Sequence, residues 1–292
     1  MGVVITGVAV NTPLGIEPKD LRPPFKPAFQ VHPPLESLDD SRAGIANDTA
    51  FRRFLKRRKD AKLFSPAAKL ALSAAGQLLE KAGTLNKEAL GLFVAVGREP
   101  PDEGDAEASL VASHSEGRLD AQLLSTEGRR LYPPLLPLKT LPNMVLAHIS
   151  IHLDICGENA TWAGDADCGI HAMRSAYWSI MEGRCDAAIA GGADSLISLG
   201  LARDRLRLGK SSLPGQAAVM LLLESEMHAQ NRGATPLMVL RHNSVYNHCQ
   251  SFEEQIGDCG AADAFIPLAQ HIIMHKAIKW GTFEVIPAGE IR

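Results

Sequence analysis

The segment 158–195, ENATWAGDADCGIHAMRSAYWSIMEGRCDAAIAGGADS, constrains the fold more than any other part of the chain. Its apolar pattern predicts a strand over 159–166, a tight turn, a helix over 169–183 and a second strand over 185–195. A helix that starts directly after one strand and returns to another is typical of a sheet covered by helices. The segment therefore predicts an α/β fold.

The same alternation runs along most of the chain. The β-branched run 3–10 and the apolar run 90–97 have the pattern of strands that are buried on both faces. Ser65 and Pro66 are typical residues for the start of a helix, which Gly83 would end. Further strands are predicted to begin at 215, 236 and 281, and further helices over 110–131, 144–155 and 253–279. This order predicts a mostly parallel sheet with helices on both faces.

Composition excludes several classes of protein. The chain has 292 residues and a formal net charge of −3, so there is no general attraction to nucleic acid. No apolar run approaches the ~20 residues that a membrane span needs, and the first residues read as a strand rather than a signal peptide. The five cysteines, an odd number without CxxC spacing, indicate reduced thiols and a cytoplasmic location; they are Cys156, Cys168, Cys185, Cys249 and Cys259.

The turn Gly164–Gly169 has two interpretations. A thiol at a helix N-terminus becomes more nucleophilic, and His171 stands three residues after Cys168, so the two could form a nucleophile and its base. In the structural interpretation, Cys168 is a small buried residue and His171 packs near the next strand. Asp165 and Asp167 favour the structural interpretation, because their charges oppose a thiolate.

Several motifs together resemble one known family, the β-ketoacyl synthases of the thiolase-like superfamily. Residues 157–159 and 169–172 match the family's segment around its nucleophile without gaps, and 183–194 resembles its G-R-x-D-x-x-L-A-G-G-x-D/E motif. Similar matches occur at 3–15, 141–143 and 214–234. The resemblance implies a thiolase-like fold, layered αβαβα. It also implies a largely complete N-terminal half over 1–235 and a shortened C-terminal half over 236–292, which together form one compact unit.

The chain departs from the family at the positions that carry its chemistry. The catalytic cysteine falls on Ala166, and Cys168 lies two positions later. One family histidine falls on Asp258, and nothing resembles the motif of the other. Because condensation needs a thiolate and two imidazoles, the resemblance implies a chain without catalytic residues of its own.

The resemblance extends to the chain length factors, which are inactive partners of ketosynthases in type II polyketide systems, and to shortened partners in aryl polyene clusters. It implies a heterodimer with a full-length ketosynthase in polyketide or fatty acid-type biosynthesis. The pocket or interface would then involve Trp162, Ala166, Cys168, Met173 and Tyr177. Two alternatives stay open: an acyltransferase or thioesterase that uses Cys168 with His171, and a homodimeric protein that binds acyl chains.

A basic run could bind an acidic acyl carrier protein, although a solvated helix face explains it equally well. It contains Arg52, Arg53, Lys56, Arg57 and Arg58. His271 and His275 have the i, i+4 spacing of metal ligands, but no third ligand stands at a matching offset. We therefore expect neither a metal nor a cofactor.

Overall fold

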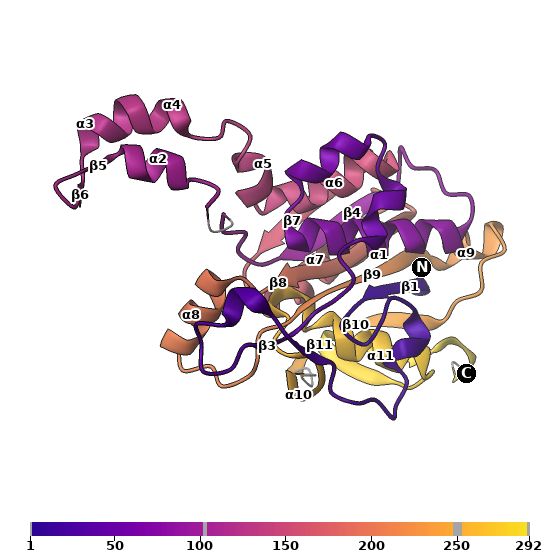
Figure 1. Ribbon diagram of the computed structural model, residues 1–292. Coiled ribbons are helices and arrows are strands. Elements are labelled where there is room, and N and C mark those ends of the chain that lie inside the picture. Colours follow the sequence, from indigo (N-terminus) through magenta and orange to yellow (C-terminus); the bar gives the residue numbers. More distant parts are fainter. Residues whose placement is uncertain (1, 102–103, 248–252, 291–292) are drawn as a thin grey trace.

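Seven strands form one curled sheet in a computed structural model, which describes residues 2–101, 104–247 and 253–290 (Figure 1). The order across the sheet is β11-β10-β1-β9-β8-β4-β7. The strands are β1 (Val3–Asn11), β4 (Gly91–Val96), β7 (Asn159–Ala163), β8 (Ala187–Ser195), β9 (Gln216–Ser225), β10 (Met238–Asn247) and β11 (Ile278–Pro287). The longer helices are α1 (Pro66–Ala82), α6 (Asn143–Leu153), α7 (Asp167–Met181), α8 (Leu199–Arg207) and α11 (Phe265–Ile273).

The predicted strands are present, but the prediction of a mostly parallel sheet is wrong. Within the described residues, β4 pairs in parallel with β7 and β8, and the remaining pairs of the large sheet are antiparallel. An apolar run predicts a buried strand whatever its direction, because direction depends on which neighbour the strand pairs with. The result is a mixed sheet with β7 at one edge.

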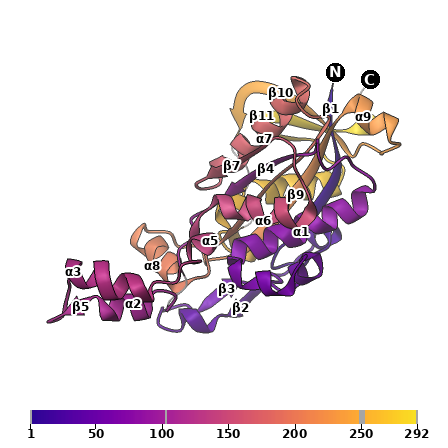
Figure 2. The same ribbon diagram turned by 90° about the horizontal axis from the view of Figure 1, so that it is seen from above.

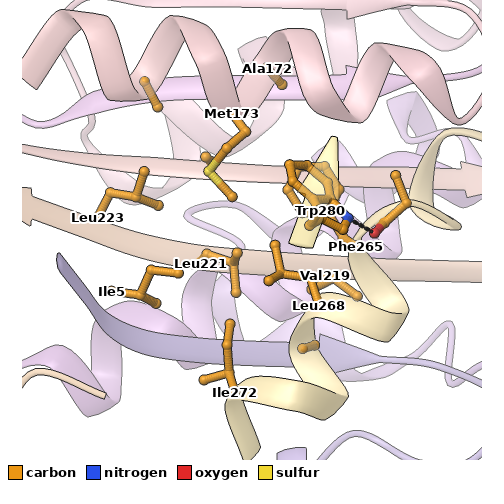
Figure 3. Close-up of a cluster of buried hydrophobic side chains, with 14 of the residues drawn as sticks. Ile5, Ala172, Met173, Val219, Leu221, Leu223, Phe265, Leu268, Ile272 and Trp280 are labelled. Carbon is orange, nitrogen blue, oxygen red and sulfur yellow. Dashed lines mark hydrogen bonds between the residues drawn. The ribbon is translucent and has the colours of Figure 1, made fainter. Parts of the chain in front are cut away.

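The two faces of the sheet bury different residues of the same strands. In β4, Leu92 and Val94 contact the cluster formed with α1 and α6, whereas Phe93 contacts the cluster formed with α7 and α11. This alternation follows from the two-residue repeat of a strand. Figure 3 shows the second cluster, in which the Trp280 indole N–H donates a hydrogen bond to the carbonyl of Ala264. The layers match the thiolase-like fold that the sequence predicts.

The region 253–279, which the sequence predicts to be mostly helical, contains its helices in separate pieces. It contains the short α10 (Glu253–Ile256), a 3-10 turn η6 (Gly260–Ala262), α11 and the start of β11. Gly257 and Gly260 have positive φ angles of 83° and 53°, which interrupt helical geometry. We call residues 257–263 the covering loop, because η6 lies over the ends of β8 and β4.

An arm formed by residues 104–132 projects from the body in both ribbon views (Figures 1 and 2). The sequence predicts a helix over 110–131, but this region contains two helical pieces that a short β-hairpin separates. The arm contains α2 (Glu107–Ala112), β5 (His114–Ser115), β6 (Arg118–Leu119), α3 (Ala121–Leu123), a π-helical turn (Leu124–Gly128) and α4 (Arg129–Leu131). Its large exposed apolar side chains are Leu110, Val111, Leu119, Leu124, Leu131 and Tyr132.

Candidate functional site

The turn before α7 presents a methyl group at the start of the helix. Ala166 is the N-cap residue, and its side chain is partly buried against the core cluster of α7 and α11. A helix N-terminus carries partial positive charge from its unpaired N–H groups. The position can favour an anion, but alanine supplies no nucleophile there.

The surroundings of Cys168 oppose an activated thiol, although it lies in the first turn of α7. Burial raises its pKa above the ordinary value, and the charges of Asp165 and Asp167 raise it further. The sulfur lies against Gly164, where a Cβ atom would be only 2.5 Å away. The His171 ring stacks on Trp162 with centroids 5.2 Å apart, and within the described residues no hydrogen bond joins it to Cys168. The geometry therefore does not favour a Cys168–His171 pair.

Asp258 forms a buried ion pair with Arg205 of α8. The second guanidinium nitrogen of Arg205 donates to the carbonyl and hydroxyl oxygens of Ser212, at 3.0 and 2.9 Å. The N–H of Gly260 donates to the other oxygen of Asp258 at 2.9 Å. Burial alone would raise the pKa of Asp258, but a hydrogen bond with Asp263, the Gly260 N–H and the Arg205 charge together hold it below its usual value. The position carries a paired negative charge, which cannot stabilise an enolate.

Asp194 is a polar residue of this region that the sequence reasoning missed. It stands near the carboxyl end of β8, whose residues are all buried. Its oxygens accept the N–H groups of Ser195 and Ala261 at 2.7 and 3.0 Å. Burial raises its pKa to about 7. The signal was in the sequence, because an ionisable residue that ends an otherwise apolar strand indicates a specific buried role.

A crevice of about 460 Å³ opens beyond the carboxyl ends of β4 and β8. Ligands of α/β proteins commonly bind outside the carboxyl ends of strands. One wall is the segment 195–201, which links β8 to α8. His32 also lines the crevice, where it hydrogen-bonds the backbone of Ile197, and burial lowers its pKa. The lining is mostly apolar and includes Pro34, Pro66, Pro100, Pro101, Ile197, Leu199 and Leu201.

A second concave surface, the β7 hollow, measures about 590 Å³ and lies on the edge strand and α7. Trp162 and Trp178 are 38% and 39% exposed in it, which is unusual for such large apolar side chains. The Trp162 indole N–H donates to the hydroxyl of Ser175 at 3.1 Å. Among the described residues, β7 pairs with β4 alone, so one side of its backbone faces outward.

The five residues predicted for a pocket or interface fall into two groups. Trp162 lies in the β7 hollow. Met173 and Tyr177 are buried in the core cluster, against which Ala166 and Cys168 also pack. The structure thus brings four of the five to the inner side of α7 and places Trp162 on the outer surface.

The basic run forms two 3-10 helices, Ala50–Phe54 and Arg58–Leu63, instead of one α-helix face. Arg53 pairs with Glu80 at 2.8 Å, and Lys56 pairs with Asp154. Arg52, Arg53 and Arg58 line a shallow hollow of about 350 Å³ with Leu55 and Ala61. Cys249 lies outside the described residues. Within them, no group of three or more His, Cys, Asp or Glu side chains could hold a metal, and no helix is long and apolar enough to cross a bilayer.

Comparison with known proteins identifies the family. The profile of the beta-ketoacyl synthase N-terminal domain matches residues 36–223, so the chain belongs to the beta-ketoacyl synthase family. Nodulation protein E of Rhizobium leguminosarum bv. trifolii is 33% identical over 113 residues, which are 34% of this chain and 28% of that protein. The match thus spans less than a third of that relative.

Solved structures of the same fold include ketosynthases and a ketosynthase/chain length factor. The ishigamide ketosynthase/chain length factor has a TM-score of 0.68 at 18% identity, and the alignment covers 98% of each chain. An oxazolomycin ketosynthase domain of Streptomyces albus JA3453 has a TM-score of 0.69 at 15% identity, covering 94% of this chain and 63% of that one. A type II polyketide ketosynthase in complex with its acyl carrier protein has a TM-score of 0.61 at 18% identity, covering 82% and 67%. At these identities the likeness shows the fold alone.

Proposed function

We propose that this chain is a non-condensing member of its family, which acts as a chain length factor-like subunit beside a full-length ketosynthase. The observation that carries the proposal is the methyl group of Ala166 at the N-terminus of α7. Claisen-type condensation requires a thiolate to hold the acyl chain and donors to stabilise an enolate. Ala166 cannot be acylated, and the negative charge of Asp258 is already paired with Arg205.

The β7 edge supports pairing with a partner subunit. Its outward backbone groups offer main-chain hydrogen bonds to a second strand. Trp162 and Trp178 beside it supply exposed aromatic area of the kind that dominates protein interfaces. The apolar side chains on the arm offer further contact area. A full-length ketosynthase is the proposed occupant of this face.

The crevice supports a role in setting chain length. Its proline and aliphatic lining suits the hydrocarbon part of a growing acyl chain. The proposed pathway is polyketide synthesis of the aryl polyene type, or fatty acid-type synthesis, in the cytoplasm. The basic run Arg52–Arg58 is the proposed contact for an acidic acyl carrier protein. The shortened second half, 236–292, serves to complete the sheet around β1.

The test combines co-expression with mass spectrometry. The chain is produced alone and together with a ketosynthase from its own genome, and the complex is incubated with an acyl thioester. We expect a stoichiometric complex in which intact-mass analysis finds the acyl adduct on the partner only. Acylation of Cys168, or a well-behaved monomer that binds no such ketosynthase, would contradict the proposal. A partner whose nucleophilic cysteine is replaced by alanine is the control, because its complex should carry no adduct.

A further inference from the structure

Asp194 lies where three segments of the chain meet. A Cβ atom on Gly97, just after β4, would lie 1.9 Å from its carboxyl, and one on Gly260 of the covering loop would lie 2.1 Å from it. Both glycines therefore bring their backbones directly against this side chain. The carboxyl group is enclosed and 2% exposed.

The two hydrogen bonds of Asp194 join different parts of the site. Ser195, which donates to Oδ1, begins the crevice wall 195–201. Ala261, which donates to Oδ2, belongs to the covering loop. A second connection runs in parallel, because Arg205 of α8 is paired with Asp258 of the same loop. One carboxyl group thus holds the wall and the loop together at their contact point.

The charges around Asp194 do not balance. Asp194 and Asp258 are both buried beside one cation, Arg205, and the loop also contains Cys259 and Asp263. Asp258 has a lowered pKa and stays charged near neutrality, whereas burial raises the pKa of Cys259 well above its ordinary value and keeps it protonated. Asp194, whose pKa burial raises to about 7, is the member of these three that titrates in the neutral range.

We propose that Asp194 is a proton-controlled clamp, which positions the crevice wall 195–201 against the covering loop and releases both as its carboxyl loses its proton. Opening exposes the carboxyl to water and restores its ordinary acidity, so opening releases a proton and becomes more favourable as pH rises. The consequence for an acyl chain in the crevice rests on the proposed function. The clamp itself does not depend on the proposed function, because it concerns only the motion of this chain.

Amide hydrogen exchange of the full chain, measured by mass spectrometry, tests the clamp without any substrate. After correction for the intrinsic exchange rate, the opening constant in peptides covering 195–201 and 257–263 is expected to increase about tenfold between about pH 6 and about pH 8. Asp194→Asn, which cannot ionise and keeps an acceptor oxygen for one of the two N–H groups, should remove this increase. Asp186→Asn, which changes an exposed carboxylate just before β8, should keep it. A flat wild-type profile, or the same slope in Asp194→Asn, would overturn the clamp and leave the proposed function untouched.

A second variant keeps the test decisive if Asp194→Asn does not fold. Asp258→Asn removes the neighbouring negative charge and frees Arg205, and both effects favour the ionised form of Asp194. The increase in exchange should therefore level off at lower pH than in the wild type, and should be smaller between about pH 6 and about pH 8. An unchanged midpoint would mean that another group controls the opening.

Discussion

At the residue scale, the chemistry of the site depends on side chains that the sequence predicts unequally well. The gapless register of the family motifs places Ala166 at the start of a helix, and the structure has it at the N-cap of α7. The partner of Asp258 could not be predicted, because Arg205 stands 53 positions earlier and no pattern links the two. The buried role of Asp194 had a local signal, but its donor Ala261 could not be predicted, because it stands 67 positions away.

The pH dependence of stability follows from Asp194. Its pKa of about 7 in the folded chain is raised from 3.8, so the folded state holds a proton that the unfolded state has lost between these values. Its contribution to stability is therefore present at low pH and disappears as pH rises through about 7. We expect the free energy of unfolding to fall by about 2 kcal/mol from about pH 5 to about pH 7 because of this group. Urea titrations of the wild type and Asp194→Asn at each pH measure the difference, and parallel curves would contradict the assignment.

A buried ion pair at the end of β9 offers a second test. Glu224 is fully buried and accepts hydrogen bonds from Thr6, from His228 at 2.7 Å and from the Arg232 Nε at 2.6 Å. Arg232→Ala would leave this carboxylate without its main counter-charge, which should cost about 3–5 kcal/mol of stability. The matched control is Arg207→Ala, whose side chain is 78% exposed and should matter little. Equal unfolding midpoints for the two variants would contradict this account.

At the element scale, individual helices and strands were predictable where local chemistry decides them. The Ser65 hydroxyl accepts the N–H of Ala68 at 3.2 Å, and α1 begins at Pro66 as the cap residues indicate. The directions of strands and the division of 253–279 were not predictable. They depend on pairing between distant segments and on the positive φ angles of Gly257 and Gly260, neither of which has a periodic signature.

The edge of β7 makes the pairing hypothesis testable with two neighbouring residues. The backbone carbonyl of Glu158 accepts an N–H from β4, and the backbone N–H of Gly164 donates to β4. Because these groups alternate along a strand, the N–H and C=O groups of residues 160 and 162 also face β4, whereas those of Thr161 face outward. Thr161→Pro should preserve the monomer fold and weaken binding to the ketosynthase more than tenfold. Ala160→Pro should instead remove a bond to β4 and destabilise the monomer. Size-exclusion chromatography and thermal unfolding separate the effects, and undiminished binding by Thr161→Pro would argue against pairing through β7.

At the scale of the whole molecule, the resemblance of a few motifs predicted the layered fold that the chain adopts. The relative placement of its surfaces was not predictable. The crevice is lined by residues near positions 32–34, 66, 99–101 and 195–201, which come together only when the chain is folded. The same holds for the projecting arm, whose hairpin turned an expected helix into two antiparallel pieces. Sequence patterns describe each segment by itself, whereas the site is made where segments meet.

The crevice predicts a change in product length for the assembled enzyme. Gly200 is an exposed residue of the crevice lining, and a Cβ there would meet no atom within 4 Å. Gly200→Phe should fill part of the crevice without disturbing the fold, and the complex should release shorter acyl products. Gly200→Ala is the matched control and should leave the products unchanged. Mass spectrometry measures the lengths of the acyl products. If the Gly200→Phe complex releases the same distribution of lengths as the wild-type complex, the growing chain does not occupy this crevice.

The Arg205–Asp258 pair also bears on how this chain can evolve. Replacing Asp258 by histidine would leave the Arg205 guanidinium without its counter-charge in the protein interior. That substitution would therefore lower the stability of the folded chain. Positions 205 and 258 are thus coupled, and a change of charge at one is expected to be tolerated only with a compensating change at the other.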